Sequence, residues 1–235
     1  MIDTTFDVRS DANGKDPDSH SPTLRRYHQL LWSKPLPGGV TFSLSTSRPG
    51  AYLHHRSEIG EFFLDSDSVM QTFSRWEVTR PIVEQLPAVD VETFQGIGYT
   101  IGGMMVFPGD RVDGKMTING ARGFTRRIAD RFDLTLECIR RHYAGADSPL
   151  AEVLHRYADF FDLFEDFAGY VDFFLLDDLV SLDGDVEFFM PFEDFSSPAV
   201  PRDVATYMEF RRRSMLFVEA RNRRILYTCR DGTDP

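Results

Sequence analysis

The clearest pattern of hydrophobic and polar positions in this chain lies between Thr117 and Tyr143. Apolar side chains recur there every three or four residues, which is the spacing of one face of an α-helix. The positions are Phe124, Ile128, Phe132, Thr135 or Leu136, Ile139 and Tyr143. Asn119 and Gly120 precede the pattern and are typical of a turn. We therefore predict a strand that turns at Asn119 and Gly120 into one long helix.

Shorter patterns predict a mixture of strands and further helices. Runs rich in β-forming residues predict short strands at 40–44, 51–54, 61–64 and 186–190. Residues 98–107 and 115–118 predict a β-hairpin around a turn that contains Pro and Gly. Helical spacing predicts helices at 24–31, 66–76, 148–164 and 204–217; a strand or helix fits 170–180, and a strand fits 221–228. Hairpins and helices are segregated along the chain, which predicts an α+β fold: an antiparallel sheet containing β-hairpins, packed against helices.

Composition narrows the class of protein. A length of 235 residues predicts a single domain over 1–235, in which residues 1–22 form a polar N-terminal arm or loop. The 21 Phe residues predict that the helices are rich in aromatic side chains. The sequence contains only two Cys, and it has neither a basic leader at the N-terminus nor a long apolar run. These features predict a cytoplasmic protein that does not bind membranes. A net charge of −11 argues against broad binding of nucleic acids, although a local basic groove stays open.

Acidic side chains on the predicted long helix are the first candidates for catalysis. Asp130, Asp133 and Glu137 are three or four residues apart, so they share one helical face with Arg126 and Arg141. Asp133 and Glu137 are like charges one turn apart, and partial burial would raise one carboxyl pKa, as a general acid requires. The alternative is a solvated face of ordinary ion pairs.

Basic and amide side chains at the start of the same helix are candidates for binding an anion. Asn119, Arg122, Arg126 and Arg127 lie at the turn and in the first helical turns. The N-terminus of a helix presents free N–H groups, which suit a phosphate. Ion pairing of these arginines with the acidic remainder of the chain is an equally good interpretation.

His28 and Lys34 complete the set of candidate catalytic residues. His28 could carry a proton near neutral pH, and Lys34 supplies a cation two residues after Trp32. Packing of His28 and Trp32 in the core is the alternative. The sequence contains no zinc ligand set, no P-loop and no nucleophile elbow, so we predict no metal site, and no motif indicates a particular cofactor.

Several long segments resemble an uncharacterised, mostly bacterial protein family of about this length. The segments that carry the resemblance are DPDSHSPTLRRYHQLLWSKPLP, YTIGGMMVFPG, KMTINGARGF, DRFDLTLECIRRHY and SPLAEVLHRYADFFDLF. The resemblance implies a single bacterial domain inside the cell, and it implies no activity and no catalytic residue.

Two functions follow from these residues. The first is an enzyme that acts on a nucleotide, a nucleic acid or another phosphate-bearing substrate; toxins and phage-defence effectors are analogous stand-alone domains. The second is a non-catalytic binding or regulatory protein whose acidic surface meets a protein partner, and a homodimer fits either function. Convergence of Asn119, Arg122, the acidic helix face and the segment from His28 to Lys34 on one cleft would favour the enzyme.

Overall fold

A computed structural model describes residues 1–46 and 53–231 of the chain. The α-helices are α1 (Pro17–His20), α2 (Pro22–Trp32), α3 (Arg80–Val83), α4 (Ala88–Gly98), α5 (Ile118–Phe124), α6 (Phe132–Tyr143), α7 (Ala151–His155), α8 (Ala158–Phe161), α9 (Phe167–Phe174) and α10 (Val204–Asp231). The 3₁₀-helices are η1 (Val8–Asp11), η2 (Ile101–Gly103), η3 (Val112–Gly114), η4 (Asp162–Phe164) and η5 (Asp177–Leu179). The strands are β1 (Lys34–Pro35), β2 (Thr41–Phe42), β3 (Leu53–Ser57), β4 (Gly60–Ser68) and β5 (Met104–Pro108).

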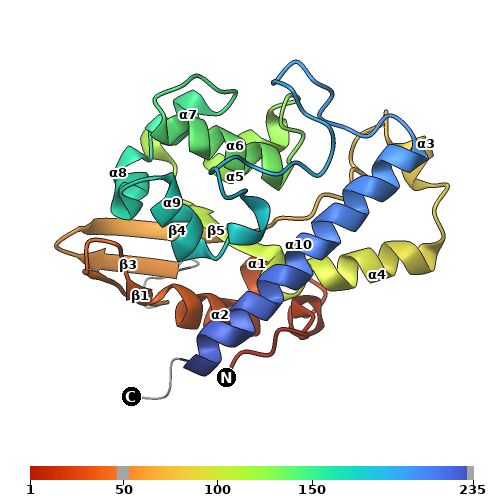
Figure 1. Ribbon diagram of the computed structural model, residues 1–235. Helices are drawn as coiled ribbons and strands as arrows, with labels where there is room; N and C mark the ends of the chain where they lie inside the picture. Colours follow the sequence, from red (N-terminus) through yellow and green to blue (C-terminus); the bar gives the residue numbers. More distant parts are fainter. Residues whose placement is uncertain (47–52, 232–235) are drawn as a thin grey trace.

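The strands form two small antiparallel sheets. β1 pairs with β2, and β3, β4 and β5 form a three-stranded sheet in that order. β3 and β4 make a hairpin in which His55 lies opposite Phe62, and the far half of β4 pairs with β5, with Ser66 opposite Val106. Every residue of β5 is buried. The predicted α+β fold with an antiparallel sheet and a hairpin is confirmed (Figure 1).

Aromatic side chains form much of the core, as predicted. The Phe164 ring packs edge-on against Tyr170 at 5.3 Å between ring centroids, and Trp32 of α2 reaches Phe174 of α9 at 5.2 Å. Asp166 caps α9, because its carboxylate accepts a hydrogen bond from the Gly169 N–H. The residues from 160 to 174 therefore join α2, α8 and α9 into one aromatic cluster.

The long helix α10 crosses the molecule and holds the central elements together (Figure 1). The guanidinium of Arg221 is fully buried and donates to three backbone carbonyls, those of Gly102 at 3.0 Å, Met104 at 2.8 Å and Phe174 at 3.0 Å. The Asn222 Oδ1 atom accepts from the Gly102 N–H at 2.8 Å. One turn of α10 thus fixes η2, the start of β5 and the end of α9.

The predicted single long helix is wrong. The chain forms α5 and α6 instead, because Ala129 and Asp130 between them adopt left-handed φ angles of 50° and 61°. The Asp130 N–H donates to the Arg122 carbonyl at 3.1 Å, so the chain folds back on α5. Asp130 consequently does not share a helical face with Asp133 and Glu137.

Other boundaries also differ from the predictions. The predicted hairpin arm at 115–118 is absent, because β5 pairs with β4 and the Thr117 hydroxyl caps α5 by accepting from the Gly120 N–H. The predicted helix at 66–76 is replaced by the end of β4, which this pairing extends to Ser68. Residues 186–190 form no strand beyond an isolated bridge, and 221–228 belong to α10.

The N-terminal residues pack against the rest of the molecule. Val8 and Ala12 are buried, and Pro17 lies buried at the start of α1. α1 contacts β4 directly. Among the described helices, none is both long and apolar enough to cross a membrane.

Candidate functional site

A group of carboxyl side chains surrounds one buried arginine where α1, β4 and α5 meet. We call Asp18, Asp67, Asp130 and Arg122 the carboxylate cluster. The Arg122 Nη1 atom lies 2.8 Å from Asp67 Oδ2, and its Nη2 atom lies 3.7 Å from Asp130 Oδ1. Its Nε–H donates to Thr135 Oγ1 at 3.0 Å. Arg122 is fully buried whereas the Asp67 and Asp130 side chains are each 25% exposed, so the carboxylates form the solvent-facing side of the cluster.

Two strained backbone segments hold Asp130 in place. Asp130 has a left-handed φ, and its Oδ2 atom accepts from Gln71 Nε2 at 2.9 Å. The Oε1 atom of Gln71 accepts in turn from the Phe73 N–H at 2.9 Å, and Phe73 has a φ of 57°. Residues held in such conformations cost about 1–3 kcal/mol each and are concentrated at functional sites. The break between α5 and α6 therefore places the Asp130 carboxylate beside Gln71 and Arg122.

The surroundings separate the pKa values of two carboxyl groups in the cluster. Burial, followed by the charges of Asp67 and Asp16, raises the pKa of Asp18 to about 8. The Oδ1 atom of Asp18 is buried, and no described residue offers it a hydrogen bond. Burial also raises the pKa of Asp67, but the charge of Arg122 opposes this effect and leaves it at about 6. At pH 7 Asp18 is therefore mostly protonated while Asp67 is mostly ionised, and two such groups form a proton donor and a proton acceptor.

Tyr99 adds a phenol beside Asp18. Burial raises its pKa, and the negative charges of Asp18 and Asp16 raise it further. The phenol consequently keeps its proton at neutral pH and remains a hydrogen-bond donor. The guanidinium of Arg9 lies over the Tyr99 ring at 5.1 Å from the ring centroid.

Of the predicted anion-binding residues, Arg122 lies inside the cluster and the others lie around it. The guanidinium of Arg122 faces carboxylates of the chain itself, which is the ion-pairing alternative for this residue. Arg126 and Arg127 are exposed between α5 and α6, and neither has an ion-pair or hydrogen-bond partner among the described residues. Asn119 lies on α5, and its Oδ1 atom is buried without a hydrogen-bond partner in the described part of the chain.

Asp133 and Glu137 are engaged in ion pairs on α6. Asp133 is fully buried, pairs with Arg131 and accepts from the Phe189 N–H at 2.9 Å. Glu137 is paired with Arg140 at 2.8 Å and with Arg141 at 2.7 Å. Of the three predicted acidic residues, only Asp130 contributes to the cluster.

His28 and Lys34 lie in the aromatic core rather than in the cluster. Trp32 Nε1–H donates to His28 Nδ1 at 2.9 Å, so a proton on Nε2 of His28 faces Ser66 Oγ at 3.1 Å. Burial lowers the pKa of His28 to about 3, which keeps the imidazole neutral at physiological pH. Lys34 Nζ lies over the Phe173 ring at 4.6 Å from its centroid, and burial lowers the pKa of Lys34. The convergence of these two residues with Arg122 on one cleft, which would have favoured an enzyme, is therefore not found.

Asp18 and Asp67 are the residues of the cluster that the sequence analysis missed. Asp18 lies in the polar segment at residues 1–22, and long stretches of chain separate it from Asp67 and Arg122. Across the described residues, no group of three or more His, Cys, Asp or Glu side chains has the geometry to hold a metal ion. The cluster is a set of carboxyl groups organised around the Arg122 guanidinium.

Comparison with known proteins places the chain in a family. The model of a family of unknown function, DUF6994, matches residues 2–225. This chain belongs to the DUF6994 family. The resemblance to an uncharacterised family is thereby confirmed, and the match includes every residue of the carboxylate cluster. No curated protein and no solved structure matches the chain.

Proposed function

We propose that this DUF6994 protein is an enzyme that uses the carboxylate cluster for general acid–base catalysis on a phosphate-bearing substrate, such as a nucleotide or a nucleic acid. The observation that carries the proposal is the pair of carboxyl groups with separated pKa values, about 8 for Asp18 and about 6 for Asp67, beside one buried arginine. Titratable groups perturbed by burial and by specific charges are concentrated at active sites.

Each residue of the cluster has a role in this proposal. Asp18 holds a proton at neutral pH and donates it to the leaving group. Asp67 is ionised and exposed to solvent on one side, so it accepts a proton from the attacking group. Arg122 is a positioning residue, since its hydrogen bonds and charge hold Asp67 and Asp130 in place.

The exposed arginines beside the cluster support an anionic substrate. Arg126 and Arg127 lie four and three residues before Asp130, in the same connection between α5 and α6. Their guanidinium groups have no partner among the described residues, although the chain as a whole carries a net charge of −11. Guanidinium groups bind phosphate through paired hydrogen bonds. If these side chains bind the phosphate of a substrate, the ester bond next to that phosphate would lie beside the carboxylates and could react there.

A substrate screen with matched variants tests the proposal. The wild-type protein is incubated with nucleotides, dinucleotides, sugar phosphates, short RNA and short DNA, and products are separated by chromatography. We expect turnover of one class, with kcat lowered at least about 100-fold in Asp18→Asn and Asp67→Asn, because acid–base catalysis contributes about 10²–10⁴-fold. Arg126→Ala should raise KM more than it lowers kcat, and the exposed Asp159→Asn should behave as the wild type.

The pH dependence provides a second test of the assignment. With Asp67 as base and Asp18 as acid, kcat/KM should be bell-shaped and highest between about pH 6 and about pH 8. Asp18→Asn should remove the fall on the alkaline side. Turnover that survives both substitutions, or that is absent for every probe, would overturn the proposal.

The proposal extends to a role in the bacterial cytoplasm as a toxin or phage-defence effector. Such an enzyme should slow growth when it is produced in bacterial cells, and the Asp18→Asn variant at equal abundance should not. Equal growth with the two proteins would contradict the effector role and leave the enzymatic proposal to the substrate screen.

A further inference from the structure

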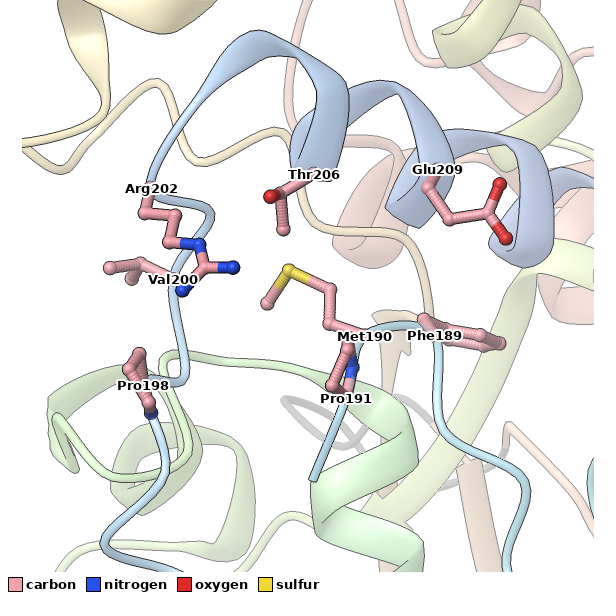
Figure 2. A pocket seen from close by; sticks show the side chains of 8 residues that line it. All are labelled: Phe189, Met190, Pro191, Pro198, Val200, Arg202, Thr206 and Glu209. Atoms are coloured by element: carbon pink, nitrogen blue, oxygen red, sulfur yellow. The ribbon is translucent and has the colours of Figure 1, made fainter. Parts of the chain in front are cut away.

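A cavity of about 270 Å³ lies between the segment at 189–200 and the first turns of α10 (Figure 2). Its apolar walls come from Phe189, Met190, Pro191, Pro198 and Val200, and its polar edge comes from Arg202, Thr206 and Glu209. None of these residues belongs to the carboxylate cluster. The cavity is therefore a separate feature of the molecule.

The polar edge presents a cation that is only loosely paired. The Arg202 side chain is 83% exposed and lies 3.8 Å from Asp203 Oδ2, beyond hydrogen-bonding distance. In Figure 2 the Arg202 guanidinium points toward the Met190 side chain, and Thr206 lies on the same side of the cavity. The Thr206 hydroxyl lies beside the Asp203 carboxylate, and its hydrogen bond helps to lower the pKa of Asp203. The polar edge of the cavity thus includes the Arg202 guanidinium and the Thr206 hydroxyl, next to apolar walls.

The acidic residue at the other end of the cavity is already compensated. Glu209 is paired with Arg212 at 2.7 Å and with Arg213 at 2.6 Å. The hydrogen bonds from these two arginines lower the pKa of Glu209 to about 2, so the carboxylate stays ionised and bound to them. The cation with the weakest pairing at the cavity is consequently Arg202, whose partner Asp203 lies 3.8 Å away.

The walls of the cavity are fixed before any ligand arrives. The Phe189 N–H donates to the buried carboxylate of Asp133 at 2.9 Å, and the Phe189 ring packs edge-on against Phe210 at 5.7 Å. Pro191 and Pro198 restrict the backbone on either side. A preformed apolar site loses little affinity to the ordering of loops on binding.

We propose that this cavity binds a small carboxylic acid with an apolar body, of the size of an aromatic carboxylate. Its ring would lie against Met190, Pro198 and Val200, and its carboxylate would accept hydrogen bonds from the Arg202 guanidinium. The volume favours this class, because an apolar cavity of about 150 Å³ accommodates benzene, and the additional space fits one carboxylate.

Binding of three matched probes tests the proposal: benzoate, benzyl alcohol and benzylamine, which differ chiefly in the charge of the group attached to the ring. Equilibrium titration followed by protein NMR measures each Kd, and shifted signals from Met190 and Val200 locate the site. We expect benzoate to bind most tightly and benzylamine most weakly. Arg202→Ala should weaken benzoate about tenfold, as expected for loss of one charge-assisted hydrogen bond, and leave benzyl alcohol unchanged.

Two further variants complete the experiment. Val200→Phe fills the cavity and should abolish binding of both benzoate and benzyl alcohol, provided that circular dichroism shows it folded. Arg56→Ala removes an exposed arginine on β3 and should bind as the wild type does. Since Arg202 is exposed, Arg202→Ala is informative even where Val200→Phe does not fold. Equal affinity for benzoate and benzyl alcohol, unchanged binding in Arg202→Ala, or no saturable binding would each overturn the proposal.

Discussion

Asp18 and Asp67 carry the same functional group in different electrostatic surroundings. Asp67 lies 2.8 Å from a guanidinium, whereas the buried Oδ1 atom of Asp18 has no hydrogen bond from the described residues. An adjacent positive charge stabilises the ionised form, and burial without a partner destabilises it. The difference between the two residues therefore follows from their neighbours and not from their chemistry.

The raised pKa of Asp18 predicts how stability depends on pH. The pKa of about 8 in the folded state lies above the unfolded value of 3.8, so binding of the proton to Asp18 stabilises the folded state. This stabilisation is complete below about pH 4 and is lost as the pH rises through 8. Asp18→Asn mimics the protonated side chain. We compare the free energy of unfolding of Asp18→Asn with that of the wild type at pH 6 and at pH 8.5. The difference should shift in favour of the variant by at least about 1 kcal/mol at the higher pH, since one pKa unit corresponds to about 1.4 kcal/mol.

Urea denaturation at the two pH values measures this difference. Asp159→Asn, at an exposed position, is the control and should show no relative change. A wild-type protein and an Asp18→Asn variant with parallel pH profiles would show that Asp18 is ionised in the folded state.

At the scale of single residues, the sequence made Arg122 an anion-binding candidate and Asp130 a catalytic candidate, but it did not predict the carboxylates that lie beside them. Both identified residues lie within one local pattern, where spacing is informative. Asp18 and Asp67 reach the same place only through contact between α1 and β4, which is a tertiary contact. For His28 the structure favours the packing alternative, because burial and the hydrogen bond from Trp32 make it a neutral core residue.

At the scale of elements, the sequence predicted the apolar faces of α2, α6 and α10 but not the break before α6. No Pro or Gly marks the break, and the apolar period continues across it. Ala129 and Asp130 adopt left-handed conformations because Gln71 binds the Asp130 side chain and Arg122 accepts from its backbone. The helical propensity of a short segment does not depend on partners that are distant in the sequence, so the sequence pattern could not predict this break.

The contact between η2 and α10 leads to a prediction about Gly102. A Cβ atom at Gly102 would lie 2.6 Å from Asn222 Oδ1 and 2.7 Å from the Val218 carbonyl oxygen. Gly102→Ala should therefore push α10 away from η2 and lower the free energy of unfolding by about 1–3 kcal/mol, the usual cost of overpacking. Urea denaturation with an unchanged m-value measures the effect.

Gly123 provides a matched control for this substitution. It lies on α5, and a Cβ atom there would meet no heavy atom within 4 Å. Gly123→Ala should be neutral or stabilise the protein by up to about 1 kcal/mol, because alanine favours the helix. Equal stability of the Gly102→Ala variant and the wild type would mean that α10 does not pack on η2 in solution.

At the scale of the whole molecule, Arg221 links three parts of the fold through backbone carbonyls. Arg221→Met replaces the guanidinium by an apolar side chain of similar shape. The carbonyls of Gly102, Met104 and Phe174 then lose the guanidinium as their hydrogen-bond donor. We expect a loss of about 3 kcal/mol or more in unfolding free energy, because each unsatisfied buried polar group costs about 1–3 kcal/mol.

Arg223→Met on the same helix is the control for Arg221→Met. Arg223 is exposed and has no partner among the described residues, so the substitution should change stability by less than about 0.5 kcal/mol. Thermal unfolding of both variants compares them directly. A similar Tm for the two would show that the buried guanidinium does not hold these parts together.

The position of α10 after all the elements on which it packs has a consequence for the order of events during synthesis. While residues 204–225 have not yet emerged from the ribosome, the nascent chain lacks the side chains that contact Phe73, Phe94 and the carbonyl of Gly102. The carboxylate cluster likewise joins residue 18 to residue 130. The ribosome therefore has to complete most of the chain before the core can close, and until then the aromatic side chains of the earlier segments need protection from aggregation by chaperones.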